Sequence, residues 1–195
     1  MVRFLCTRVG VIMKIIISLC LFVIIALSLP VMLSSDAKVI LRAIHKTDGV
    51  SFETLLMPSW VADLKLKTFA IRDCNLVFST NSNTGPVINF LVAAYGGKEV
   101  NNLRVAAYIT QFAKQGCDVN AYDQAGMTSL HAAVLFQQPQ LVKLLLDNNA
   151  DMRKKIQRPG KRVDGMQPLK FAKFLSTTNS HQALKDIITI LKNKR

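Results

Sequence analysis

The chain has 195 residues, enough for a membrane segment and one modest soluble domain. Half of its residues are hydrophobic, and its formal net charge is +13 at pH 7. A positive charge of this size favours acidic partners but does not determine the fold. Its four cysteines and three histidines lie too far apart to match any zinc-binding spacing, so we expect no metal site and no cofactor.

The apolar residues are concentrated near the N-terminus. Between residues 9 and 33, Lys14 is the only charged residue, and an apolar run of this length is close to the roughly 20 residues that cross a bilayer as a helix. Basic residues precede this run and Asp36 follows it. By the positive-inside rule, residues 1–35 are predicted to be a cytoplasmic N-region and a transmembrane signal anchor that enters the membrane through residues 14–33.

A cleavable signal peptide is the alternative, because Ser35, Asp36 and Ala37 offer small residues at the spacing needed for cleavage after Ala37. The expected location is a bacterial inner membrane, crossed once, with the N-terminus in the cytoplasm and the C-terminal domain in the periplasm. Cleavage would instead leave a soluble periplasmic protein.

Beyond the apolar run, 22 basic and 12 acidic residues leave a net charge of +10. Nucleic acid is a poor partner for a domain outside the cytoplasm, so we expect an acidic protein or an anionic lipid surface. Cys74 and Cys117 are the only cysteines in this part, and in an oxidising compartment they are candidates for a disulfide that closes a long loop. Two buried thiols are the alternative.

Residues 36–82 are predicted to form divergent N-terminal helices. An apolar stripe at helical spacing (Val39, Ile40, Ala43, Ile44) predicts an amphipathic helix over residues 37–46 that ends at 47–49. Residues 51–60 start another helical turn, which stops at Pro58. Residues 61–78 fit both the helical and the strand period and are interpreted as helix, and residues 81–86 are predicted to be a loop.

From residue 86 onward the pattern becomes a series of helix pairs. The predicted helices are 86–97, 103–116, 128–138, 139–149, 167–175 and 180–195, with Pro139 at a first turn, where proline is tolerated. A basic stretch with helix-breaking residues, 152–165, separates the last two pairs. A repeating helix–turn–helix–loop unit of this kind indicates a repeat architecture.

Residues 123–152 resemble an ankyrin repeat. The matching residues include Asp123, Gly126, Thr128, Leu130, His131, Ala133, Val142, Lys143, Leu144, Leu145, Leu146, Ala150 and Asp151. Ser129, Val134 and Asn149 replace the proline, second alanine and glycine of the family pattern. Residues 116–121 match the close of a preceding repeat and residues 165–172 the opening of a following one. Gly165 follows Gly126 by 39 residues, longer than the usual repeat of about 33, which predicts an insertion within 153–162.

The resemblance implies an all-α fold: a short ankyrin-type stack of about three repeats over residues 83–195, capped by the divergent helices of 36–82 and preceded by one N-terminal transmembrane helix. Five residues are expected to face neighbouring repeats: Leu130, Ala133, Val142, Leu145 and Leu146. Thr128 is expected to cap its helix. In the family, the histidine ring holds the turn backbone, so His131 is expected to be structural.

The sequence contains no nucleophile motif, no phosphate-binding glycine loop and no paired carboxylates, so we predict that the protein is not an enzyme and has no catalytic residue. Ankyrin repeats usually bind partners through hairpin tips and first helices. By position, this resemblance predicts partner contacts at Tyr122, Gln124, Ala125, Met127, Leu135 and Phe136. The basic insertion adds Arg153, Lys154, Lys155, Arg158, Lys161 and Arg162, which could steer an acidic partner or form a solvated loop.

The leading hypothesis is a non-enzymatic protein-binding module tethered to the inner membrane. It would sequester or inhibit a protein such as a periplasm-acting toxin delivered by a neighbouring cell's type VI secretion system, as an immunity protein does. One alternative is an accessory scaffold for a periplasmic enzyme, for example a catalase, or for an envelope complex. Another is a secreted ankyrin effector.

Overall fold

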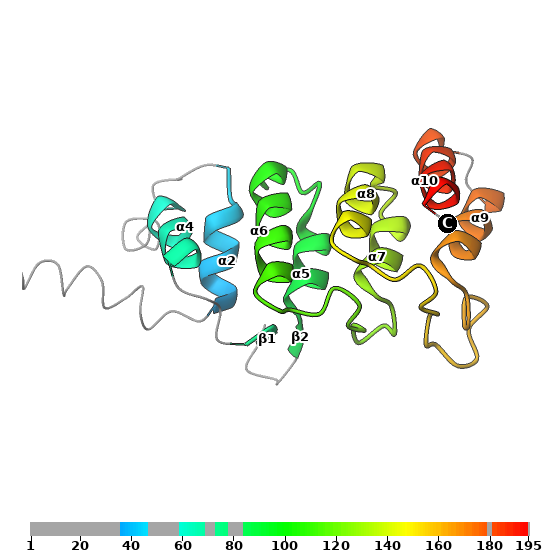
Figure 1. Ribbon diagram of the computed structural model, residues 1–195, viewed down its shortest axis with the longest axis horizontal. Helices are drawn as coiled ribbons and strands as arrows, with labels where there is room; N and C mark the ends of the chain where they lie inside the picture. The colour runs from blue at the N-terminus through cyan, green and yellow to red at the C-terminus, as the bar shows by residue number, and fades with distance from the viewer. Residues whose placement is uncertain (1–35, 47–58, 69–72, 78–83, 179–180, 195) are drawn as a thin grey trace, which may run out of the picture. The chain divides into compact units, whose positions relative to one another are not determined.

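The computed structural model describes residues 36–46, 59–68, 73–77, 84–178 and 181–194 (Figure 1). The chain divides into two compact units, Met1–Ala43 with Thr47–Thr68, and Ile44–Lys46 with Phe69–Arg195. The predicted membrane segment at 1–35 lies outside the described residues. Within the described ranges, every helix is too short or too polar to cross a bilayer.

Two helices belong to the first unit, α2 (Asp36–Ile44) and α4 (Ser59–Thr68). The predicted stripe of α2 is confirmed, because Val39, Ile40 and Ala43 are fully buried. Helix α4 shows no comparable separation of faces, and its Trp60 and Leu64 are largely exposed. Most of the predicted turn at 51–60 and the predicted helix end at 47–49 lie outside the described part of the chain.

The second unit opens with a short antiparallel pair of strands, β1 (Asn75–Val77) and β2 (Thr84–Pro86). The predicted helix over 61–78 is right through Thr68, where α4 covers it, and wrong at residues 75–77, which form β1. The predicted loop at 81–86 is wrong at residues 84–86, which form β2. The Asp73 carboxylate accepts from the Asn75 amide at 2.8 Å, a local bond that competes with helix. The chain then runs extended, with Leu76 buried. Strand β1 belongs to this unit. The predicted domain boundary at residue 82 instead groups β1 with the N-terminal helices.

Three helix pairs follow, as the sequence predicts (Figure 1). They are α5 (Val87–Ala94) with α6 (Asn102–Lys114), α7 (Ser129–Leu135) with α8 (Pro139–Asp147), and α9 (Pro168–Thr178) with α10 (Gln182–Asn193). The first helices of the pairs pack in one row, α5 on α7 and α7 on α9. The second helices form another row, α6 on α8 and α8 on α10.

The core lies between these helices. All five residues expected to face neighbouring repeats are buried: Leu130, Ala133, Val142, Leu145 and Leu146. Since a single helix pair leaves one apolar side open, burial of both sides requires the stack.

The turns repeat in backbone conformation even where the residue changes. Gly116 and Asn149, which follow the second helices α6 and α8, are both left-handed, with φ of 95° and 66°. Gly96 and Gln137, which follow the first helices α5 and α7, are left-handed as well, with φ of 84° and 55°. The asparagine that replaces the family glycine at 149 thus keeps the glycine-like backbone, which asparagine tolerates better than most residues.

Two hairpins connect the pairs. The first hairpin (residues 121–128) turns at Asp123–Gly126. The second hairpin (residues 155–166) is closed by bonds between Ile156 and both Gly165 and Met166. The extra length of the predicted insertion lies at its tip, residues 158–164, which is built from two consecutive turns.

Candidate protein-binding surface

His131 joins the second helix pair to the second hairpin. Its Nδ1 lies 2.9 Å from the Thr128 hydroxyl and its Nε2 lies 3.1 Å from the Met166 carbonyl oxygen. Because a carbonyl only accepts, Nε2 carries the proton and Nδ1 accepts from Thr128. The Thr128 hydroxyl is therefore used by the ring and makes no cap bond to the helix, contrary to expectation.

The surroundings keep the His131 ring neutral. Its side chain is fully buried, and burial lowers its pKa from 6.5 to about 4, against an opposing effect of the hydrogen bond to Met166. A neutral ring with both nitrogens bonded holds the chain in place and has no free nitrogen for proton transfer, consistent with the structural role that the resemblance implies.

The second hairpin docks closely against the first. The Gln157 amide donates to the Gly126 carbonyl oxygen at 2.9 Å, and Ile156 is buried to 1 % exposure. A Cβ at Gly126 would lie 1.9 Å from the Gln157 oxygen, and the φ of Gly126 is +67°. Glycine is thus required there twice, by backbone conformation and by space.

Part of the predicted contact set comes together at this junction. The Tyr122 hydroxyl donates to the Lys155 carbonyl oxygen at 3.1 Å, and the Lys154 ammonium lies 5.6 Å from the centre of the Tyr122 ring. Arg153 pairs with Asp151 at 3.2 Å, while the Arg158 amide bonds the Asp164 carboxylate at the hairpin tip. Most of the basic segment thus belongs to an ordered hairpin, while Arg153, Lys155, Lys161 and Arg162 are exposed to solvent.

Leu135 and Phe136 form a second, separate patch. They are 38 % and 45 % exposed and lie at the C-terminal end of α7, whereas the hairpins adjoin its N-terminal end. At 1.5 Å per residue, the two ends are roughly 10 Å apart. Of the predicted first-hairpin residues, Gln124 is exposed and Ala125 is half-buried.

Met127 is a correction to the predicted contacts. It is only 8 % exposed, so it offers little surface to a partner. Its amide donates to the Asp123 carboxylate at 2.8 Å, and its carbonyl oxygen accepts from the Asn89 side chain at 3.2 Å. The bond from Asn89 holds this arm of the first hairpin beside α5, where the apolar Met127 side chain becomes part of the core.

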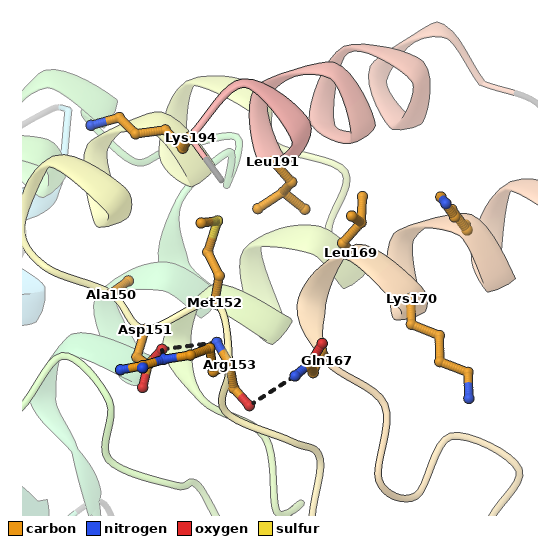
Figure 2. A pocket seen from close by; sticks show the side chains of 10 residues that line it. Ala150, Asp151, Met152, Arg153, Gln167, Leu169, Lys170, Leu191 and Lys194 are labelled. Carbon is orange, nitrogen blue, oxygen red and sulfur yellow. Dashed lines mark hydrogen bonds and ion pairs between the residues drawn. The ribbon is translucent and has the colours of Figure 1, made fainter.

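A pocket of about 690 Å³, missed from the sequence, lies between residues 150–153 and the helices α9 and α10 (Figure 2). Its lining combines apolar residues with four cations: Ala150, Asp151, Met152, Arg153, Gln167, Leu169, Lys170, Lys173, Leu191 and Lys194. The available signal was Lys170, which stands at the repeat position that His131 occupies in the preceding pair.

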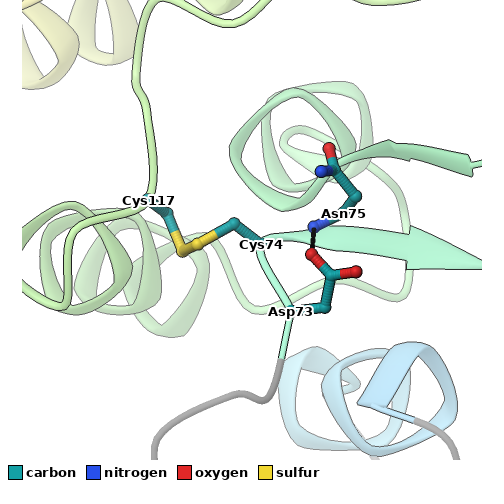
Figure 3. Close-up of a disulfide and its surroundings, with 4 residues drawn as sticks. All are labelled: Asp73, Cys74, Asn75 and Cys117. Atoms are coloured by element: carbon teal, nitrogen blue, oxygen red, sulfur yellow. Dashed lines mark hydrogen bonds between the residues drawn. A yellow bond between two sulfur atoms is a disulfide. The ribbon is translucent and has the colours of Figure 1, made fainter.

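Cys74 and Cys117 form a disulfide in the structure, with Cα atoms 5.3 Å apart (Figure 3). The bond ties the start of β1 to the segment that leaves α6, and Cys117 is buried. Across the described residues, no three histidine, cysteine or acidic side chains gather in a way that could hold a metal ion.

One repeat of this stack matches a known family model. The family model described as Ankyrin repeat matches residues 125–155. An L-asparaginase from Dirofilaria immitis is 33 % identical over 159 residues, which cover 76 % of this chain but 23 % of that protein. The chain thus spans about a quarter of the length of this relative. Ankyrin repeats are a non-enzymatic fold for protein interaction. The chain therefore contains an ankyrin repeat at residues 125–155, and ankyrin repeats indicate a protein-binding module.

Proposed function

We propose that this module is tethered to a membrane and captures an acidic protein. The observation that carries the proposal is the pairing of two different patches around α7. The ordered basic hairpin lies at one end, and the exposed Leu135 and Phe136 lie at the other. Exposed apolar side chains of this kind provide affinity, and rim cations steer an acidic partner toward them.

The proposed compartment is the periplasm of a bacterial cell. The predicted signal anchor at 1–35 supports export of the domain, and the disulfide between Cys74 and Cys117 supports an oxidising environment. Fusion of alkaline phosphatase to the C-terminus tests this orientation, because that enzyme is active only after export. An active fusion agrees with the proposal, and an inactive fusion with normal expression contradicts it.

For the role of binding, we favour sequestration of a toxin, as an immunity protein does. A binding module without catalytic groups can act by covering the active site of its partner. The second candidate is an accessory module of an enzyme, and it is supported by the match to part of a protein named L-asparaginase.

The test is capture of partners by the tagged full chain from solubilised envelopes, followed by enzyme assays of the mixture. An acidic hydrolase that loses activity on mixing supports sequestration. A partner enzyme whose activity is unchanged or raised supports the accessory role.

The binding surface is tested by charge insertion. The double variant Leu135→Asp/Phe136→Asp should abolish capture while the far-UV circular dichroism spectrum stays unchanged. Leu103→Asp is the matched control, since Leu103 is 84 % exposed on α6, in the other row of helices. Equal loss of capture in both variants would contradict this placement of the surface.

A further inference from the structure

The pocket between residues 150–153 and the last helix pair has an apolar interior. Leu191 and Ala150 are buried at its base, and the half-buried Met152 and Leu169 form its sides. In Figure 2 the side chains of Met152 and Leu191 point into the same space from opposite sides. Its volume of about 690 Å³ lies within the range of clefts that bind small ligands.

Two of the four cations around this interior are already neutralised. Arg153 pairs with Asp151, which lines the same pocket, and Lys194 pairs with Asp147 of α8 at 2.9 Å. Lys170 and Lys173 are exposed, and among the described residues neither ammonium has an ion pair or hydrogen bond. The net charge of the site therefore resides on these two lysines at its rim.

The two lysines lie three residues apart on α9, so their side chains are neighbours on one helix face. The apolar interior lies beside them. A matching ligand needs at least two anionic groups next to an aliphatic group. An extended peptide meets this need, because its side chains alternate between two faces and can place carboxylates at the rim and an aliphatic residue inside.

We infer that this pocket is a second docking site, which takes an acidic linear peptide segment with an aliphatic residue between its carboxylates. The carboxylates contact Lys170 and Lys173, and the aliphatic side chain lies between Met152, Leu169 and Leu191. The site is separate from the patch at Leu135 and Phe136, and it does not depend on the role of that patch.

The first experiment measures binding of a fluorescein-labelled peptide, Glu-Leu-Glu-Asp-Leu-Glu, to the full chain in neutral detergent by fluorescence polarisation. The peptide should bind, a Gln-Leu-Gln-Asn-Leu-Gln peptide should not, and the affinity should fall with added salt. Lys170→Glu/Lys173→Glu should weaken binding by at least about tenfold, because like charges then meet the carboxylates.

The matched control is Lys185→Glu/Lys192→Glu, which reverses two exposed lysines of α10 that do not line the pocket. This control and Leu135→Asp/Phe136→Asp should each leave peptide affinity within about twofold of the parent protein. Loss of peptide binding in Leu135→Asp/Phe136→Asp would show that the pocket and the patch form one site, and it would overturn the inference. Loss of partner capture without loss of peptide binding would separate them.

Carbodiimide coupling provides a second readout, because it joins a carboxylate to an amine only in direct contact. The expected peptide adducts lie on Lys170 and Lys173, as mapped by mass spectrometry. Adducts spread evenly over the exposed lysines would indicate a general attraction to basic surface and would overturn the inference. So would displacement of the peptide by anionic vesicles at lower concentration than by unlabelled peptide, which would assign the site to lipid headgroups.

Discussion

The second and third helix pairs occupy the same repeat positions but are connected to their surroundings differently. In the second pair, Leu130 is fully buried and His131 bonds the next hairpin through Met166. At the equivalent positions of the third pair, Leu169 is half-buried and Lys170 is exposed. The same helical frame thus gives a tie between repeats in one case and the wall of a pocket in the other. His131 has the following hairpin to bond, whereas among the described residues no hairpin follows the third pair and Lys170 stays exposed.

The largest expected effect comes from truncating the equivalent leucines. Leu130→Ala should lower the free energy of unfolding by about 2–5 kcal/mol, because it leaves a cavity between packed helices. Leu169→Ala should cost less than half of that, because part of its surface already contacts water. Urea unfolding followed by circular dichroism measures both. Equal losses would show that the two repeats are buried alike.

At the first helix pair the connection is covalent, because a disulfide joins Cys117, which follows α6, to Cys74, which precedes β1. Replacing both Cys74 and Cys117 by serine should lower the free energy of unfolding by about 2–4 kcal/mol, because the bond closes a loop between residues 43 positions apart. Unfolding of the parent protein with and without dithiothreitol gives the same quantity. A double variant as stable as the oxidised parent would contradict a stabilising role.

His131 should make the free energy of unfolding depend on pH. Its folded pKa of about 4 lies below the unfolded value of 6.5, so the unfolded chain binds the proton more tightly. The stabilisation is present above pH 6.5 and is lost progressively as the pH falls toward 4, by up to roughly 3 kcal/mol.

Unfolding at pH 7 and pH 4.5 tests this prediction, with His131→Gln as the control that removes the titrating ring. The carboxyls of Asp147 and Asp151 also have lowered pKa values, through hydrogen bonds from Lys194 and from the Arg153 amide. They are present in both proteins, so the difference between the two proteins isolates the contribution of His131. A variant with the same pH dependence as the parent would rule out His131 as the cause.

The smallest effect concerns the turn after the second helix of each pair. Asn149→Gly should raise the free energy of unfolding by about 0.5 kcal/mol, because glycine adopts the left-handed backbone with less strain. Gly116→Asn should lower it by a similar amount. Thermal unfolding resolves such differences, and opposite signs to these would mean that side-chain contacts outweigh backbone strain.

The predictability of the fold follows the strength of the repeat motif. Residues 123–152 carried enough of the pattern to predict both helices, the buried face and the structural role of His131. Strand β1 was missed because the apolar residues of 61–78 fit either period and the local bond from Asp73 leaves no periodic signal. Strand β2 was missed because Thr84, Gly85 and Pro86 are residue types typical of loops. Met127 was placed on the surface because its position in the motif gives no sign of the bonds that hold it beside α5.

The pocket was missed for another reason. It arises from residues 150–153, α9 and the end of α10, which meet only when the last two pairs are stacked. Spacing within one repeat cannot reveal such a site. The insertion was predicted from its length, but the sequence did not tell which of its residues belong to the docked strands and which to the tip.

The second hairpin has a consequence for how this chain tolerates change. Its docking to the stack rests on Ile156, the bond from Gln157 to Gly126 and the bond from His131 to Met166. The tip at 158–164 lies beyond all three, and its own turns are closed by bonds within it. The Arg162 guanidinium at the tip also lies 5.4 Å from the centre of the Phe174 ring of α9. Foreign residues inserted between Pro159 and Gly160, both exposed, would lengthen the tip and leave these docking residues unchanged. That makes the tip a natural graft point for an epitope or a fluorescent probe.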